Sequence, residues 1–95
     1  MHVIIIARDA PGRAGIRADV HARHRAHLDS ADEAPLRLCV SGPTLGPDGQ
    51  PDGSMLIFEA EDLGIVRAFV ERDPMTDVWS SFALYPFDWK RGRPT

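Results

Sequence analysis

The spacing of apolar residues alternates along the chain between the patterns of strands and helices, and the order of these patterns constrains the fold most. Short β-branched or alternating runs predict strands at residues 2–7, 36–41, 54–60 and 81–87. Apolar stripes with helical spacing predict helices over residues 13–31 and 63–70. This order predicts an α+β, ferredoxin-like βαββαβ fold, in which a four-stranded antiparallel sheet carries both helices on one face.

Glycine and proline mark the expected ends of these elements. Pro35 is expected to end the first helix, Gly42-Pro43 the second strand, and Asp73-Pro74 the second helix. Residues 46–53 consist almost wholly of turn formers and predict a solvent-facing loop. A short turn through Trp79 is expected to lead into the fourth strand. In the second strand, one face is expected to carry Leu36, Leu38 and Val40 and the other Arg37, Cys39 and Ser41.

Most of the predicted strands carry apolar side chains on both faces. In the first strand, Val3 and Ile5 alternate with Ile4 and Ile6. Two helices on one side can cover only one face of a sheet, whereas a sheet with one solvated face normally alternates between apolar and polar residues. We therefore expect a homodimer in which the uncovered faces of two sheets pack together.

The chain has the length and composition of one small domain spanning residues 1–95. Its 95 residues are 43% hydrophobic and 26% charged, which excludes disordered and collagen-like classes. No apolar run approaches the roughly 18 residues of a membrane span, and the first residues lack the basic region of a signal peptide. The single cysteine, Cys39, excludes an intrachain disulfide and a cysteine zinc site, and it favours a cytoplasmic location.

Charge is distributed unevenly along the sequence. The net charge of −3 gives no indication of nucleic-acid binding. Residues 1–30 carry five arginines and all four histidines against three aspartates, whereas residues 48–77 carry eight acids against two arginines. This division is consistent with two solvated faces of opposite sign. It is also consistent with a cationic pocket beside the first helix that attracts a small anionic ligand.

His24 is the most informative candidate for chemistry. It lies between Val20 and Leu28 on the apolar stripe of the first helix, so its ring should be partly buried. A buried imidazole needs hydrogen-bond partners, either as a core residue bonded to a backbone carbonyl or as an acid–base group. His21 and His27 flank it, but the outer two histidines diverge around the helix, and no metal-binding motif is present. We therefore expect neither a metal nor a cofactor.

Asp73 is the candidate partner for this histidine. The following Pro74 pushes Asp73 out of helical geometry, at a helix end where the dipole disfavours a carboxylate. Asp73 would benefit there from a cationic or hydrogen-bonding partner, although a simple turn aspartate is the alternative. We expect Arg17 to hold an anionic substrate group, and Gly42 and Ser54 to shape the pocket with backbone and hydroxyl donors.

An ordered set of residues along the whole chain resembles the YciI-like (YCII-related) family. The set consists of Arg17-x3-His21-x2-His24-x3-Leu28, Ser41-Gly42-Pro43, Gly53-Ser54, Asp73-Pro74 and Pro86-Phe87. Family members often carry arginine where this chain has His21, and leucine where it has Arg25.

The resemblance implies a ferredoxin-like fold that forms dimeric α/β barrels, related in fold to muconolactone isomerases and small cofactor-free monooxygenases. It implies an active-site histidine and aspartate at His24 and Asp73. One branch of the family is a dehydrochlorinase that acts on a chlorinated hydroxyquinol. We therefore expect acid–base chemistry of the lyase, isomerase or dehydrochlorinase type on a small polar or aromatic molecule. A non-catalytic ligand-binding or regulatory module and a cofactor-free monooxygenase are the alternatives.

Overall fold

The computed structural model describes residues 1–33 and 35–93 and confirms the expected ferredoxin-like fold. Its strands form one antiparallel sheet in the order β2-β3-β1-β4. The elements in chain order are β1 (His2–Asp9), α1 (Ala14–Asp29), the 3-10 helix η1 (Ser30–Glu33), β2 (Leu36–Leu45), β3 (Pro51–Ala60), α2 (Leu63–Glu71), the 3-10 helix η2 (Pro74–Asp77) and β4 (Trp79–Phe87).

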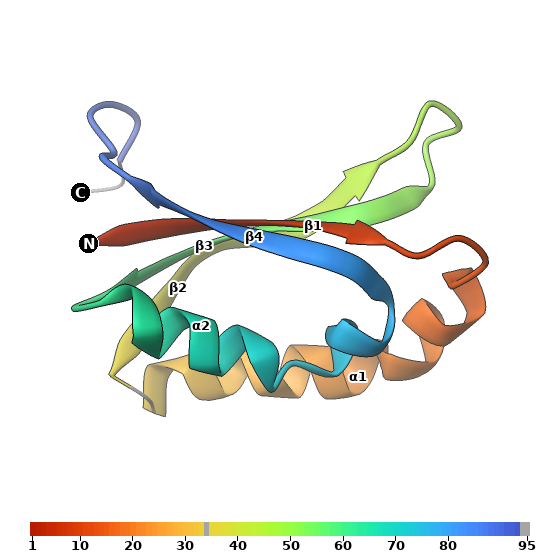
Figure 1. The fold of residues 1–95 in the computed structure, drawn as a ribbon, viewed down its shortest axis with the longest axis horizontal. Coiled ribbons are helices and arrows are strands. Elements are labelled where there is room, and N and C mark those ends of the chain that lie inside the picture. The colour runs from red at the N-terminus through yellow and green to blue at the C-terminus, as the bar shows by residue number, and fades with distance from the viewer. Residues whose placement is uncertain (34, 94–95) are drawn as a thin grey trace.

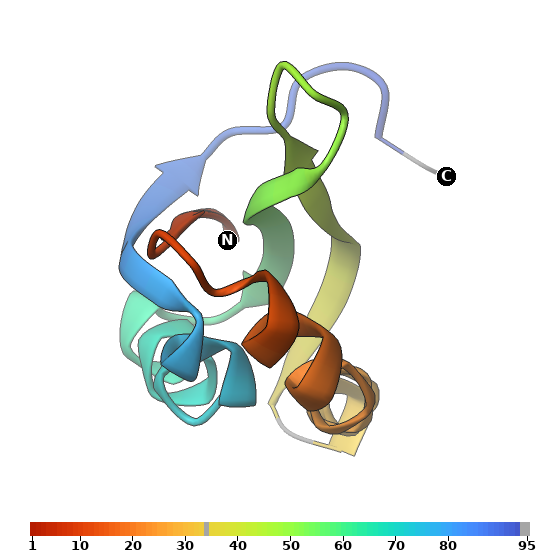
Figure 2. The same cartoon turned by 90° about the vertical axis from the view of Figure 1, so that its right-hand side faces the viewer.

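Both long helices lie on the same side of the sheet, and the other side carries no helix (Figure 1). The end-on view shows α1 and α2 next to each other beneath a curved sheet (Figure 2). Alternate strand residues such as Val3, Ile5 and Phe58 point toward the helices and are fully buried. Val66 and Phe69 of α2 complete this core from the other layer. The hydrophobic core therefore fills the space between sheet and helices, as two-layer packing requires.

The second strand extends beyond its predicted end. We expected Gly42-Pro43 to stop it, but β2 continues to Leu45 and Pro43 pairs with Ser54 of β3. Proline is tolerated there because β2 is an edge strand, so the missing N–H faces no neighbouring strand. Likewise β3 begins at Pro51, so the loop predicted over 46–53 shortens to a hairpin turn closed by a 2.8 Å hydrogen bond from the Gly46 N–H to the Gln50 carbonyl.

A bulge at Cys39 interrupts the alternation of side chains that was expected along β2. Leu38 pairs with Phe58, and Val40 pairs with the neighbouring residue of β3, Ile57. Cys39 is therefore an extra residue of β2 without a partner in β3. This shift turns Val40 to the side of the sheet without helices and Ser41 to the helix side. Trp79 also differs from its predicted position. It begins β4 instead of lying in a turn, because it pairs with Asp9 at the register shift between β1 and β4.

The face of the sheet without helices is apolar in its middle, and we call it the open face. Tyr85 is 53% exposed and Phe87 39% exposed on this face, and Val40 lies beside Ile57. By strand pairing, its apolar side chains are Ile4, Ile6, Val40, Met55, Ile57, Ala83, Tyr85 and Phe87. The polar residues His2 and Glu59 lie at one end of the face, and Arg8 and Ser81 lie at the other. Within residues 1–33 and 35–93, no helix combines the length and the apolar character that crossing a bilayer would need.

Gly53 is required by the close approach of three strands. A Cβ atom at this position would overlap the carbonyl oxygen of Ala7 and lie 2.7 Å from the Thr44 hydroxyl. We predict that Gly53→Ala lowers the free energy of unfolding by about 1–3 kcal/mol, measured by urea denaturation. Gly42→Ala is the matched control, since nothing lies within 4 Å of its added methyl group. Equal stability of the two variants would contradict this packing.

Candidate active site

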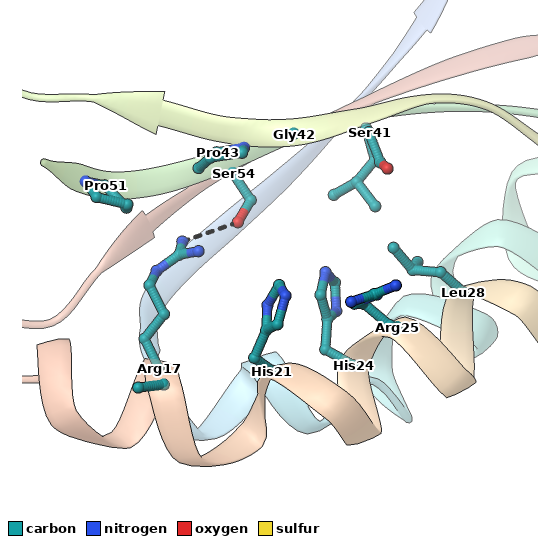
Figure 3. Close-up of a pocket in the computed structure, with 12 residues that line it drawn as sticks. Arg17, His21, His24, Arg25, Leu28, Ser41, Gly42, Pro43, Pro51 and Ser54 are labelled. Atoms are coloured by element: carbon teal, nitrogen blue, oxygen red, sulfur yellow. Dashed lines mark hydrogen bonds between the residues drawn. The ribbon is translucent and has the colours of Figure 1, made fainter. Parts of the chain in front are cut away.

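A cavity of about 280 Å³ lies between α1 and the strands β2 and β3 (Figure 3). Its walls come from α1 on one side and from β2 and β3 on the other. The lining residues are Arg17, Ala18, His21, His24, Arg25, Leu28, Ser41, Gly42, Pro43, Pro51, Ser54 and Leu56. No acidic side chain is among these residues, whereas two arginines and two histidines are. The cavity therefore has a cationic and polar character with apolar walls.

The structure brings His24 and Asp73 into direct contact. The His24 Nδ1 atom lies 2.8 Å from both carboxylate oxygens of Asp73. Because an ionised carboxylate can only accept hydrogen bonds, Nδ1 carries the proton of this contact. The opposite ring nitrogen, Nε2, has no hydrogen-bond partner within the described parts of the chain, and His24 lines the cavity. A neutral His24 therefore offers an unprotonated Nε2 to a molecule bound there.

Asp73 owes its position to Pro74. Its backbone is extended, with φ −70° and ψ 130°, and its side chain caps η2 by accepting from the Met75 N–H at 2.9 Å. Asp73 is only 2% exposed, so its carboxylate needs these hydrogen bonds to offset the loss of water. Asp73 itself does not line the cavity. It contacts the cavity only through His24, which it fixes in orientation.

Arg17 is held more tightly than the sequence indicates. Its Nε and Nη2 atoms donate to the two carboxylate oxygens of Asp9 at 2.9 and 3.2 Å. Nη2 also donates to the Gly53 carbonyl at 2.7 Å and to the Ser54 hydroxyl at 3.1 Å. The remaining nitrogen, Nη1, has no partner among residues 1–33 and 35–93. Arg17 thus joins the start of α1 to β1 and β3 and leaves one end of its guanidinium available to a ligand.

Gly42 and Ser54 both lie in the cavity wall. Gly42 is exposed on the edge strand, where it presents backbone and no side chain. Ser54 is 4% exposed, and its oxygen accepts from both Arg17 and the Trp79 indole N–H, the latter at 3.3 Å. The site therefore contains Arg17, His24, Gly42 and Ser54 directly, with Asp73 behind His24.

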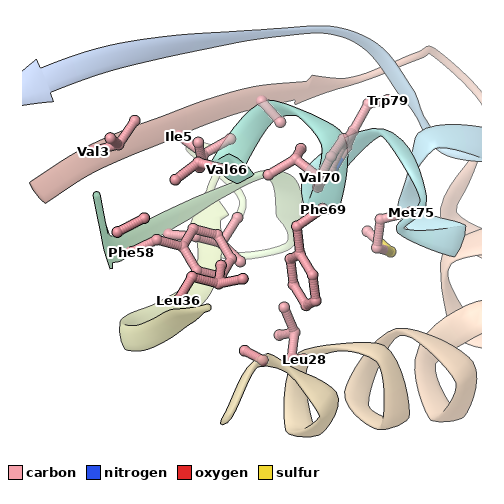
Figure 4. Packing of buried hydrophobic residues seen from close by; sticks show 14 of the residues in the cluster. Val3, Ile5, Leu28, Leu36, Phe58, Val66, Phe69, Val70, Met75 and Trp79 are labelled. Atoms are coloured by element: carbon pink, nitrogen blue, oxygen red, sulfur yellow. The ribbon is translucent and has the colours of Figure 1, made fainter. Parts of the chain in front are cut away.

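His27 and His2 lie outside the cavity, whereas His21 lines it with His24. His27 stacks on Phe69 with ring centroids 4.1 Å apart, and its Nε2 lies 2.8 Å from the Phe69 carbonyl oxygen. Phe69 reaches from α2 toward Leu28 and the end of α1 (Figure 4). His2 contacts Glu59 at the far end of the sheet. In the described residues, no three histidine, cysteine, aspartate or glutamate side chains gather in a metal-binding arrangement.

The sequence patterns do not identify two residues that hold the side chains of the cavity wall in place. Asp9 is the carboxylate that holds Arg17, and Trp79 donates to Ser54. They pair across the register shift between β1 and β4, which neither the apolar spacing nor the turn residues reveal. A bulge next to a site commonly redirects side chains in this manner.

Comparison with known proteins identifies the family of the chain. The sequence model of the YCII-related domain matches residues 1–88. The chain is similar to the solved 5-chloro-2-hydroxyhydroquinone dehydrochlorinase (TftG) of Burkholderia phenoliruptrix AC1100, in complex with 2,5-dihydroxybenzoquinone. The two are 34% identical over 93% of this chain and 94% of that one, with a TM-score of 0.80. No curated protein sequence matches significantly.

More distant structures share the fold alone. An uncharacterized NIPSNAP domain protein from Burkholderia xenovorans is 14% identical, covers 100% of both chains and has a TM-score of 0.57. A candidate antibiotic biosynthesis monooxygenase from Nitrosomonas europaea is 15% identical over 92% of this chain and 98% of that one, with a TM-score of 0.53.

The contacts of His24 and His27 predict opposite tautomers. His24 should carry its proton on Nδ1, facing Asp73, and His27 should carry its proton on Nε2, facing the Phe69 carbonyl. Nitrogen-15 NMR of the imidazole rings, at a pH where both are neutral, distinguishes these forms. His27 serves as the internal control on the same helix. A neutral His24 protonated on Nε2 would contradict the orientation described for this site.

Proposed function

Since the chain belongs to the YCII-related domain family, we propose that it is an enzyme that transfers protons on a small, oxygen-substituted ring. Within that class, we propose the elimination of hydrogen chloride from a chlorinated, hydroxylated aromatic substrate. The observation that carries this proposal is the 2.8 Å contact between His24 Nδ1 and the buried Asp73 carboxylate, beside a cavity that His24 lines. The dehydrochlorinase that is 34% identical to this chain supports the same chemistry.

The pair of side chains suits general acid–base catalysis. Asp73 holds the imidazole in one tautomer and stabilises the imidazolium that forms when Nε2 accepts a proton. His24 can then return that proton to another atom of the bound ring. In this proposal His24 is the catalytic residue, and Asp73 positions it.

Loss of hydrogen chloride from a chlorohydroquinone can proceed by proton transfer alone. A first ring hydroxyl loses its proton, and a proton is added to the chlorine-bearing carbon, so that this hydroxyl becomes a carbonyl. A second hydroxyl then loses its proton, the C–Cl bond breaks, and chloride leaves with the bonding electron pair. The product is a quinone, and the net change is the loss of one proton and one chloride. No oxidant is needed, and His24 Nε2 could accept and donate each proton in turn.

The walls of the cavity suit such a ligand. Leu28 and Leu56 offer apolar surface to a ring, and Arg17 and Arg25 offer positive charge to its ionised oxygens. Hydroxylated quinones are anionic near neutral pH because their hydroxyl groups are vinylogous carboxylic acids. We propose that Arg17, Gly42 and Ser54 form the substrate-binding part of the site.

We also propose that the chain acts as a homodimer joined through the open face. Tyr85, Phe87 and Val40 are exposed there although they are large and apolar. A second copy packed sheet against sheet would remove this surface from water, which favours association.

We predict that His24→Gln lowers turnover of a chlorinated trihydroxybenzene by about 10²–10⁴-fold, because the general base is lost. Asp73→Asn should lower turnover as well, since an amide cannot stabilise the imidazolium as a carboxylate does. Chloride release and quinone absorbance measure the reaction, and circular dichroism verifies the fold.

His27→Gln is the matched control for this prediction. Glutamine can still donate to the Phe69 carbonyl, and His27 does not line the cavity. Turnover of this variant should stay within a few-fold of the parent chain. Oxygen uptake without chloride release by the parent chain would overturn the proposed reaction in favour of an oxygenase.

We predict that Tyr85→Lys converts the dimer to monomer, because a lysine charge on the open face would have to be desolvated on association. Sedimentation velocity at several concentrations measures this change. Ala22→Lys, on the exposed side of α1, is the control and should leave the dimer intact. A parent chain that sediments as a monomer at all concentrations would contradict the proposed dimer.

A further inference from the structure

The hydrogen-bond roles at Ser54 are determined by chemistry alone. A serine hydroxyl has one donor hydrogen and two acceptor lone pairs. Arginine and the tryptophan indole can only donate, so the Ser54 oxygen accepts from Arg17 Nη2 at 3.1 Å and from Trp79 Nε1 at 3.3 Å. Nη2 has two hydrogens for three acceptors, which are Ser54, the Gly53 carbonyl and Asp9, so its hydrogen bond to Ser54 is a shared one. Both lone pairs of Ser54 nevertheless face donors. The hydroxyl hydrogen must point in a third direction, away from these two residues.

This hydrogen has no acceptor within the described parts of the chain. Ser54 is 4% exposed, and the space that it borders is the cavity. The hydroxyl of Ser54 is therefore a donor directed at whatever occupies that cavity. A freely rotating hydroxyl could accept or donate, whereas this one can only donate.

The donors and acceptors left without a protein partner make the two ends of the cavity chemically different. Figure 3 shows Arg17 next to Ser54 at one end of the cavity, with His24 further along α1. The Ser54 O–H and the Arg17 Nη1 group are donors without a protein acceptor in residues 1–33 and 35–93. His24 Nε2, with Nδ1 protonated toward Asp73, is an acceptor. A bound molecule thus meets donors at one end and a base at the other.

Trp79 is the residue that restricts Ser54 in this way. It is 7% exposed, at the edge of the core where β4 begins (Figure 4), and it does not line the cavity. Its indole N–H makes a buried hydrogen bond to Ser54. Without it, one lone pair of Ser54 would be unoccupied and the hydroxyl could turn its hydrogen away from the cavity.

We propose that Trp79 is a positioning residue that fixes Ser54 as a hydrogen-bond donor, and that the Ser54–Arg17 end of the cavity binds a carbonyl or phenolate oxygen of the substrate. This inference rests on the proposed function and deepens it. It restricts the substrate to rings with an acceptor oxygen at one end and an acidic hydroxyl or ring position near His24. A ring hydroxyl that meets this end does so as an acceptor, through a lone pair or as the ionised phenolate, because the groups of Ser54 and Arg17 there are donors.

The test is a double-mutant cycle on ligand binding. The probe is 2,5-dihydroxybenzoquinone, whose colour allows the dissociation constant to be measured without turnover. Ser54→Ala should weaken binding about ten-fold or more, because a hydrogen bond to a charged oxygen is lost. Trp79→Phe keeps an aromatic ring in the core, removes the N–H donor together with some side-chain volume, and should weaken binding several-fold. In the double variant, Trp79→Phe should add almost nothing to the effect of Ser54→Ala.

A full-size effect of Trp79→Phe in the Ser54→Ala background would overturn the positioning role, since Trp79 would then act through packing. Unchanged binding by Ser54→Ala would overturn the donor assignment. Ser80→Ala is the control, because its hydroxyl donates to the Arg8 carbonyl outside the cavity. It should bind the quinone like the parent chain.

Two independent readouts separate this inference from the proposed function. Quinone binding that weakens in Ser54→Ala, together with no chloride release by the parent chain, supports the donor end and contradicts the dehydrochlorination. Chloride release that is lost in His24→Gln, together with equal quinone binding by Ser54→Ala and the parent chain, supports the proposed function and contradicts the donor end.

Discussion

The contact between His24 and the buried carboxylate of Asp73 is the interaction on which the site depends. His24 is on α1 and Asp73 caps η2 just after α2, so this contact joins α1 to η2 on the covered face of the sheet. A carboxylate that is 2% exposed requires donors, and the imidazole and the Met75 N–H supply them. Because Nδ1 is engaged in this contact, Nε2 is left for the cavity. The same interaction therefore satisfies a buried charge and orients a base.

The order of the elements and the inward position of His24 could be predicted because both follow from periodicity. Val20 and Leu28 are buried on either side of His24, as the four-residue spacing requires. The position of Asp73 also follows from a local rule, since a residue before proline leaves helical geometry. Periodicity and local rules alone could not predict that the two side chains meet, because 49 residues separate them and the packing of α1 on η2 decides their distance. The pairing was expected from the family resemblance.

The residues that sequence reasoning missed depend on irregularities in strand pairing. The register shift of β1 aligns Asp9 with Trp79, and the bulge at Cys39 turns Ser41 toward the cavity. Strand periodicity assumes an unbroken register, so it assigned Val40 to the wrong face and left Trp79 in a turn. The predicted end of β2 at Gly42-Pro43 was wrong for another reason. Turn propensity is a local preference, and pairing of an edge strand with β3 outweighs it.

The cationic residues around the cavity differ in how firmly they are held. Arg17 is fixed by Asp9, Gly53 and Ser54, so its position follows from the fold. His21 and Arg25 both line the cavity and are exposed, and the described parts of the chain give neither of them a comparable set of contacts. Arg25 lies eight residues after Arg17, so the two arginine charges are about 12 Å apart along the axis of α1. Because other contacts fix Ser54 and His24, a substitution at His21 or Arg25 can change the charge of the cavity without moving either of them.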